Sequence, residues 1–128
     1  MKMNKAVYDT RFFVDSYYSK DELLLKKIRA HRARKRYVSV IVVHEVYNLA
    51  LKREGRETAK NQVAHISEEF EVVPVDDQIA ETSAELRHKY HLSMGDSVIA
   101  ATALALEAVC ISDDPNFGQI KEIETAWI

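Results

Sequence analysis

The stretch LSMGDSVIAATALALEAVCISDDPNF, Leu92–Phe117, decides the fold expected for this chain of 128 residues. It contains Gly95-Asp96 near its start, continues through a nearly uncharged helix and strand, and reaches the polar run Ser112–Asp114 near its end. An apolar segment with carboxylates at both ends predicts a buried scaffold that holds acidic groups at its rim. Metal binding is one use for such a rim.

Short apolar runs alternate with helical repeats along the rest of the chain. Strands are expected at Lys5–Tyr8, Tyr37-Val38, Glu71–Val75, Val109–Ser112 and Ile123–Ile128. Helices are expected at Arg11–Tyr18, Asp21–Arg36, Val40–Gly55, Arg56–Phe70, Asp77–Tyr90 and Ser93–Glu107, with a loop or short helix at Asp114–Ile120. This order predicts one α/β domain with a central, mainly parallel sheet of about four to five strands and helices on both faces.

Polar residues before these helices are candidate helix caps. Thr10, Ser39 and Asp76 each precede a helical repeat, where a side-chain oxygen can accept from the first free amides. The β-branched run Val40–Val43 leaves a second reading open, because periodicity alone would also permit a strand there.

The composition is that of one soluble globular domain over residues 1–128. Hydrophobic residues make up 47% and charged residues 30%, and the net charge of −2 indicates no partner. The single cysteine, Cys110, excludes an internal disulfide framework and is expected to be buried and inert. No apolar run has the length of a signal peptide core or a membrane helix. We therefore expect a cytoplasmic location and no association with a membrane.

Four carboxylates fall where the predicted topology brings residues together. Asp9 and Asp114 follow apolar strands, whose carboxyl ends lie at one edge of a parallel sheet. Glu45 and Asp96 lie on helices that can lean over that edge. Clustered carboxylates repel one another unless a cation neutralises them, and hard oxygen ligands favour Mg²⁺ or Mn²⁺ over zinc. The number of ions, one or two, stays open.

Three of these four acids also have a plain structural interpretation. Asp9 and Asp96 fit helix starts equally well, and Asp113-Asp114 before Pro115 fits a turn. Glu45 is the most informative, since a lone charge in the apolar run VIVVHEVYNLA is costly to bury.

With these residues in place, the chain resembles the PIN domain family, and within it the VapC-like toxin ribonucleases. The motifs that carry the resemblance are VYDT (Val7–Thr10), SVIVVHE (Ser39–Glu45), GDSVIAATAL (Gly95–Leu104) and ISDDPNF (Ile111–Phe117). Each motif is weak alone, but the four follow one another at family-like spacing over nearly the whole chain. Three residues depart from the family pattern: Arg11 replaces a small hydroxyl or amide residue, Ser112 replaces a threonine, and Asp113 is an additional acid.

The resemblance implies an endoribonuclease that uses one or two Mg²⁺ or Mn²⁺ ions. It implies that Asp9, Asp96 and Asp114 ligate metal, while Glu45 ligates metal or orients the attacking water. Asp113 is the alternative to Asp114. Thr10 and Ser112 would orient carboxylates through their hydroxyls.

The resemblance also implies two protein partners. VapC-like proteins are usually homodimers, and a small antitoxin, whose C-terminal segment enters the acidic pocket, usually restrains them. The aromatic helix RFFVDSYY is a candidate dimer face, unless it only packs in the core.

A basic run offers contacts for RNA phosphates. Such contacts give binding that depends on salt concentration and not on base sequence. The candidates for RNA binding are Arg11, Arg29, Arg32, Arg34 and Lys35. The alternative for the basic run, which extends from Lys26 to Arg36, is a solvated helix end, where positive charge interacts favourably with the helix dipole.

Two other functions are weighed against a ribonuclease. One is a PIN-like module that binds protein or RNA without catalysis. The other is a phosphotransfer protein with an aspartyl-phosphate intermediate. The dehalogenase type of that protein needs an acid two residues after Asp9, where Arg11 stands, and the receiver type needs a paired acid that Asp9 lacks.

Overall fold

The computed structural model describes residues 4–128, which form a sheet surrounded by helices. The strands are β1 (Lys5–Tyr8), β2 (Lys35–Ser39), β3 (Glu71–Val73), β4 (Val109–Ile111) and β5 (Thr125–Ala126). The helices are α1 (Thr10–Tyr18), α2 (Glu22–Ala30), α3 (Val40–Arg53), α4 (Arg56–Glu69), α5 (Asp77–Tyr90), α6 (Met94–Leu106) and α7 (Pro115–Gly118).

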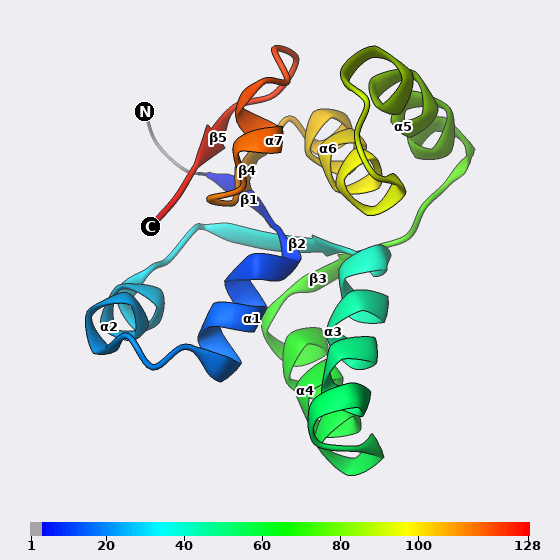
Figure 1. The fold of residues 1–128 in the computed structure, drawn as a ribbon. Coiled ribbons are helices and arrows are strands. Elements are labelled where there is room, and N and C mark those ends of the chain that lie inside the picture. Colours follow the sequence, from blue (N-terminus) through cyan, green and yellow to red (C-terminus); the bar gives the residue numbers. More distant parts are fainter. Residues whose placement is uncertain (1–3) are drawn as a thin grey trace.

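The five strands form one sheet in the order β3-β2-β1-β4-β5, and every neighbouring pair is parallel. Figure 1 shows α5 and α6 on one side of the sheet and α1 and α2 on the other. The predicted α/β class and the parallel sheet are therefore confirmed. Parallel strands place their carboxyl ends at one edge, which positions the candidate site.

The centre of the core is β1 with α6 packed across it. Ala6, Val7 and Tyr8 are fully buried, and α6 contacts β1, β2 and β4. Ile99, Ala100, Ala101 and Ala103 have no exposed surface, so α6 is enclosed on almost every side. Its small side chains permit this close approach to the sheet. No helix in residues 4–128 is both long and apolar enough to cross a membrane.

The start of α3 settles the open choice for the β-branched run. The Ser39 side chain accepts a hydrogen bond from the Ile41 amide at 3.2 Å, and Val40–Val43 is helical. Val42 is fully buried against the core. A good N-cap and burial of one helical face outweigh the lower helix propensity of valine.

The prediction that Thr10 caps the first helix was wrong. Asp9 is the N-cap, and its Oδ1 accepts from the Thr10 amide at 2.8 Å, so Thr10 is the first residue of α1. The Thr10 hydroxyl is thereby left free to contact another element.

The predicted helix Asp21–Arg36 was also too long. α2 ends at Ala30, and the chain then turns to enter β2 at Lys35. Two contacts from elsewhere in the chain explain this end: Tyr8 Oη bonds to His31 Nε2 at 2.8 Å, and the Lys35 amide donates to Asn4 O at 2.8 Å. Pairing with β1 thus extends the strand predicted at Tyr37-Val38 and removes Lys35 and Arg36 from the helix.

Other boundaries differ by a few residues. β3 ends at Val73, before Pro74, which cannot donate to a strand partner. β4 ends at Ile111 and β5 covers only Thr125–Ala126, shorter than predicted.

Candidate active site

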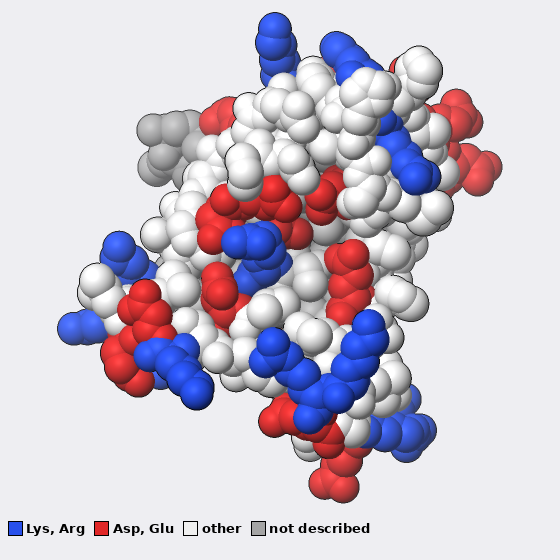
Figure 2. Space-filling view, in the orientation of Figure 1, with Lys and Arg blue, Asp and Glu red and all other residues white. Residues whose placement is uncertain are grey.

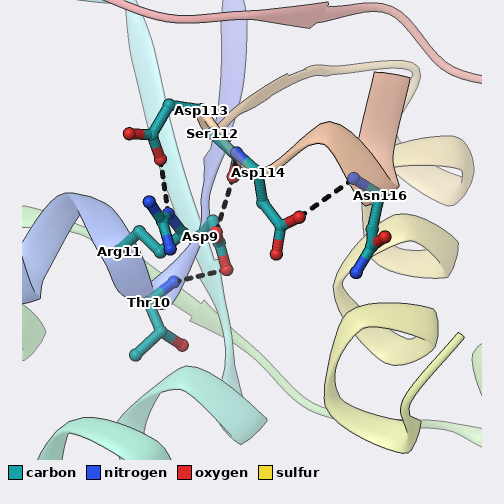
Figure 3. A network of polar contacts seen from close by, with 7 residues as sticks. All are labelled: Asp9, Thr10, Arg11, Ser112, Asp113, Asp114 and Asn116. Carbon is teal, nitrogen blue, oxygen red and sulfur yellow. Dashed lines mark hydrogen bonds and ion pairs between the residues drawn. The ribbon is translucent and has the colours of Figure 1, made fainter. Parts of the chain in front are cut away.

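Asp9 lies at the centre of a polar network where β1 ends. Its carboxylate accepts from Ser112 Oγ at 2.6 Å and from the Thr10 amide at 2.8 Å, and the residue is only 3% exposed. Ser112 Oγ in turn accepts from the Asp114 amide at 3.0 Å, as Figure 3 shows. Ser112 therefore links the carboxyl ends of β1 and β4 through one hydroxyl.

The environment of Asp9 favours the protonated form. Burial raises the pKa of Asp9 to about 6, opposed by the hydrogen bond from Ser112 and the Thr10 amide. The negative charges of Asp96 and Glu45 add to the rise. Asp9 thus carries a charge that its surroundings penalise and that a bound cation would stabilise.

Glu45 reaches the same edge from α3, where it is partly buried. The Thr10 hydroxyl donates to Glu45 Oε1, so the residue after Asp9 holds the glutamate in place. Gly95 of α6 lies against the other oxygen, since a Cβ at this position would be 2.6 Å from Glu45 Oε2. Contacts from α1 and α6 therefore set the position of Glu45.

Asp96 occupies the first turn of α6, and the Ser93 side chain caps that helix by accepting from the Asp96 amide at 3.1 Å. Burial raises the pKa of Asp96, and the charges of Asp114 and Glu45 raise it further. A hydrogen bond from the Asn116 side chain opposes the rise. Asp96 therefore interacts with carboxylates from two other elements.

Asp113 and Asp114 point to different partners (Figure 3). Asp114 caps α7, and its Oδ1 accepts from the Asn116 amide at 2.9 Å. Asp113 Oδ1 accepts from Arg11 Nε at 2.5 Å, and this hydrogen bond lowers the pKa of Asp113. Asp113 is thus occupied by an ion pair, while Asp114 interacts electrostatically with Asp96.

The sheet edge therefore gathers Asp9, Glu45, Asp96 and Asp114 into one electrostatically coupled rim. In the part of the chain from Asn4 onward, however, no three acidic, histidine or cysteine side chains converge tightly enough to enclose one ion. The donor set fits Mg²⁺ or Mn²⁺ in its chemistry, because all four groups supply hard oxygens. Burial, and to a lesser extent the neighbouring carboxylates, raises the pKa values of Asp9 and Asp96, and a bound cation would oppose that rise.

The basic residues are distributed more widely than the sequence suggested. Lys35 pairs in register with Lys5 at the start of the strands, so it lies at the sheet edge opposite Asp9. Arg32 Nη1 donates to the carbonyls of Arg29 and His31, at 2.7 and 2.6 Å. Figure 2 shows acidic side chains gathered in the middle of one face around basic ones, with further basic groups toward its lower part.

Three residues contact the rim in ways that were not predicted from the sequence. Ser93 had a recognisable signal, because Ser93 and Asp96 have the spacing of a capping box. Gly95 was noted only as part of a motif, and its contact with Glu45 depends on the packing of α6 against α3. Asn116 had no signal, since its hydrogen bond to Asp96 joins separate segments.

Comparisons with known proteins agree with this architecture. The PIN domain family model matches residues 6–123. No curated protein sequence gives a significant match.

The chain is similar to several solved structures. A toxin-antitoxin complex from Klebsiella pneumoniae contains a chain with 25% identity and a TM-score of 0.74, covering 96% of this chain and 99% of that one. DNA-bound VapBC from Salmonella typhimurium gives 21% identity, a TM-score of 0.80 and 98% coverage of both chains. VapC20 from Mycobacterium tuberculosis, a toxin that cleaves the sarcin-ricin loop, gives 20% identity, a TM-score of 0.77 and coverage of 93% and 98%.

Proposed function

The chain belongs to the PIN domain family, and from that premise we propose that it is a metal-dependent endoribonuclease and the toxin of a toxin–antitoxin pair. The observation that carries the proposal is Asp9, a buried carboxylate whose pKa is raised to about 6 and whose charge is opposed by Asp96 and Glu45. A cation beside such a rim would stabilise its charged form. The solved VapC20 structure, similar in fold, is described as a toxin that cleaves the sarcin-ricin loop.

The proposed metal-binding residues are Asp9, Asp96 and Asp114. Ser112 and the Thr10 amide hold Asp9 by hydrogen bonds at 2.6 and 2.8 Å, so its oxygens have a fixed direction. A divalent ion bound there would act as a Lewis acid: it would lower the pKa of a bound water molecule and offset the negative charge on the phosphate. The coupling of Asp96 with Asp114, together with the Arg11–Asp113 pair, favours Asp114 over Asp113 as the third group.

Glu45 has a separate role in the proposal. It accepts a hydrogen bond from the Thr10 hydroxyl through Oε1, which leaves Oε2, beside Gly95, to accept a hydrogen bond from the attacking water. The water oxygen attacks phosphorus and gives up a proton to solvent, the phosphorus–oxygen bond of the RNA strand breaks, and the leaving oxygen takes up a proton from solvent. Glu45 thereby orients the nucleophile.

The decisive experiment measures cleavage of a defined panel of RNAs by the purified protein with Mg²⁺, with Mn²⁺ and with EDTA. We expect cleavage with either ion, none with EDTA, and none by Asp96→Asn protein at any Mn²⁺ concentration. Retained Mn²⁺-dependent cleavage by Asp96→Asn protein would refute the assignment of the site.

A second candidate is a PIN-like module that binds RNA or protein without catalysis. The observation that favours it is that, among residues 4–128, no three ligand side chains stand in a closed group. Calorimetric titration with Mn²⁺ separates the two candidates. We expect binding that Asp9→Asn abolishes, whereas no binding by the unaltered protein would favour the module.

The protein partners are proposed on the same basis. The Klebsiella pneumoniae and Salmonella typhimurium structures are described as a toxin-antitoxin complex and as VapBC, which supports a small antitoxin partner. A homodimer is proposed from the family resemblance alone. The chain has apolar surface for such contacts: a hollow of about 370 Å³ along α3 is lined by Val40, Val43, Tyr47 and Leu51 among others. Light scattering of the purified chain, alone and mixed with a candidate antitoxin, measures both assemblies.

A further inference from the structure

Arg11 projects from the first turn of α1 into the rim of carboxylates, beside Asp113 and Asp9 (Figure 3). Its Nε donates to Asp113 Oδ1 at 2.5 Å. A guanidinium group stays protonated in proteins at any ordinary pH. A fixed positive charge therefore stands at the mouth of the acidic site.

Only one side of this guanidinium is engaged. Within residues 4–128, Nε makes the hydrogen bond to Asp113 and the two terminal amino groups make none. The Arg11 side chain is 54% exposed. Arg32 and Arg36 differ, since Arg32 Nη1 donates to two backbone carbonyls and Arg36 Nη2 lies 3.5 Å from Glu69. Arg11 thus has free donors beside its anchored Nε.

An RNA strand that approaches this rim meets strong like-charge repulsion, which a cation at the mouth reduces. Guanidinium suits this position because its planar fork can bind a carboxylate and a phosphate with different edges at the same time. A lysine in the same place would supply charge but not two directed edges.

We propose that Arg11 is a substrate-positioning residue: Asp113 holds it through Nε, and its terminal amino groups bind a phosphate of the RNA strand beside the bond that is cut. The inference rests on the proposed function and deepens it. It also gives a role to two of the residues, Arg11 and Asp113, that depart from the pattern of the family.

The test measures RNA binding in Asp96→Asn protein, which is not expected to cut its ligand. Fluorescence anisotropy of a labelled oligoribonucleotide is recorded over a range of NaCl concentrations. Arg11→Gln should weaken binding about tenfold and reduce the slope of log Kd against log salt by about one, as the loss of one phosphate contact predicts. Arg11→Lys should keep the slope and recover part of the affinity.

Lys121→Gln is the matched control, because Lys121 lines a hollow with Asn4, Lys5 and Val109 at the opposite edge of the sheet. It removes one positive charge from the chain without touching the rim. Equal salt slopes for Arg11→Gln and Lys121→Gln would overturn the proposal. Unchanged melting temperatures for both variants are expected, since exposed ion pairs contribute little to stability.

The anchoring role of Asp113 is tested by a double-mutant cycle on the same binding reaction. Asp113→Asn removes a repelling charge in every background, but it also releases Arg11 where Arg11 is present. We therefore expect Asp113→Asn to improve RNA binding more in Arg11→Gln protein than in protein that retains Arg11. Equal changes in the two backgrounds would show that Asp113 does not act through Arg11.

Failure of the proposed function gives a different result. If the Asp96→Asn parent binds no RNA and the unaltered protein cuts none, the proposed ribonuclease activity is overturned and the inference falls with it. If the parent binds RNA and Arg11→Gln leaves the slope of log Kd against log salt unchanged, only the inference is overturned.

Discussion

Gly95 lies so close to Glu45 that a Cβ on the glycine would stand 2.6 Å from Glu45 Oε2. The contact joins the second residue of α6 to the sixth residue of α3. Because the Thr10 hydroxyl holds the other carboxylate oxygen, Glu45 is confined from both sides. The absence of a side chain at Gly95 thus determines where the glutamate can lie.

Gly95→Ala should therefore displace Glu45 and lower kcat of RNA cleavage by about 100-fold, since an error of about 1 Å in position costs a reaction about that much. Helix propensity alone would favour alanine at this place. Gly118→Ala in α7 is the control, because no atom lies within 4 Å of a Cβ there. Cleavage assays and melting curves of both variants separate misplacement from unfolding; full activity in Gly95→Ala would contradict the assigned role of Glu45.

Ser112→Ala should shift the pH dependence of cleavage to higher pH. The Ser112 hydroxyl stabilises ionised Asp9 through a bond of 2.6 Å, and this contact lowers the pKa of Asp9. Its loss raises that pKa, so a higher pH is needed to ionise the carboxyl group. The pH–rate profile measures the shift, and Ser112→Thr, which keeps a hydroxyl, should restore the original profile.

Stability should fall as pH rises through the titration of Asp9 in the absence of divalent ions. The pKa of Asp9 is raised from 3.8 to about 6 in the folded protein, so folding favours the protonated carboxyl. The contribution of Asp9 is therefore most favourable below about pH 4 and is lost by about pH 6, with a difference of about 3 kcal/mol for a shift of about two units.

Asp9→Asn tests this sign directly. The variant should unfold at a higher denaturant concentration than the unaltered protein at pH 7.5 in EDTA, and the difference should shrink toward pH 4. Added Mn²⁺ should stabilise the unaltered protein and not the variant. A variant less stable than the unaltered protein at pH 7.5 would show that ionised Asp9 is favoured by its surroundings.

The parts of the fold that were predictable depend on local signals. Ser39 before Val40 marked the start of α3, and the alanine-rich repeat after Ser93 marked α6. Strands that alternate with helices led to the parallel sheet, and the sheet led to the shared edge of Asp9 and Asp114. Each of these steps needs only neighbouring residues and the rules of chain connection.

The parts that were not predictable depend on contacts between distant segments. α2 ends at Ala30 because Tyr8 binds His31 and because Lys35 pairs with β1, and helical periodicity contains neither fact. The ion pair of Arg11 with Asp113 joins residues 102 positions apart. The choice between Asp113 and Asp114 could not be made from the sequence for this reason.

That choice yields the last prediction. Asp114→Asn should weaken Mn²⁺ binding about tenfold or more, because the charge of Asp114 acts on Asp96. Asp113→Asn should not weaken it, because the Asp113 carboxylate is already paired with Arg11 Nε at 2.5 Å. Calorimetric titration with Mn²⁺ measures both affinities without relying on cleavage. Both substitutions remove one negative charge from neighbouring residues, so each serves as the control for the other. Equal loss of Mn²⁺ affinity in the two variants would mean that overall charge, and not ligation by Asp114, holds the ion; a loss confined to Asp113→Asn would mean that the Arg11 pair opens when metal binds.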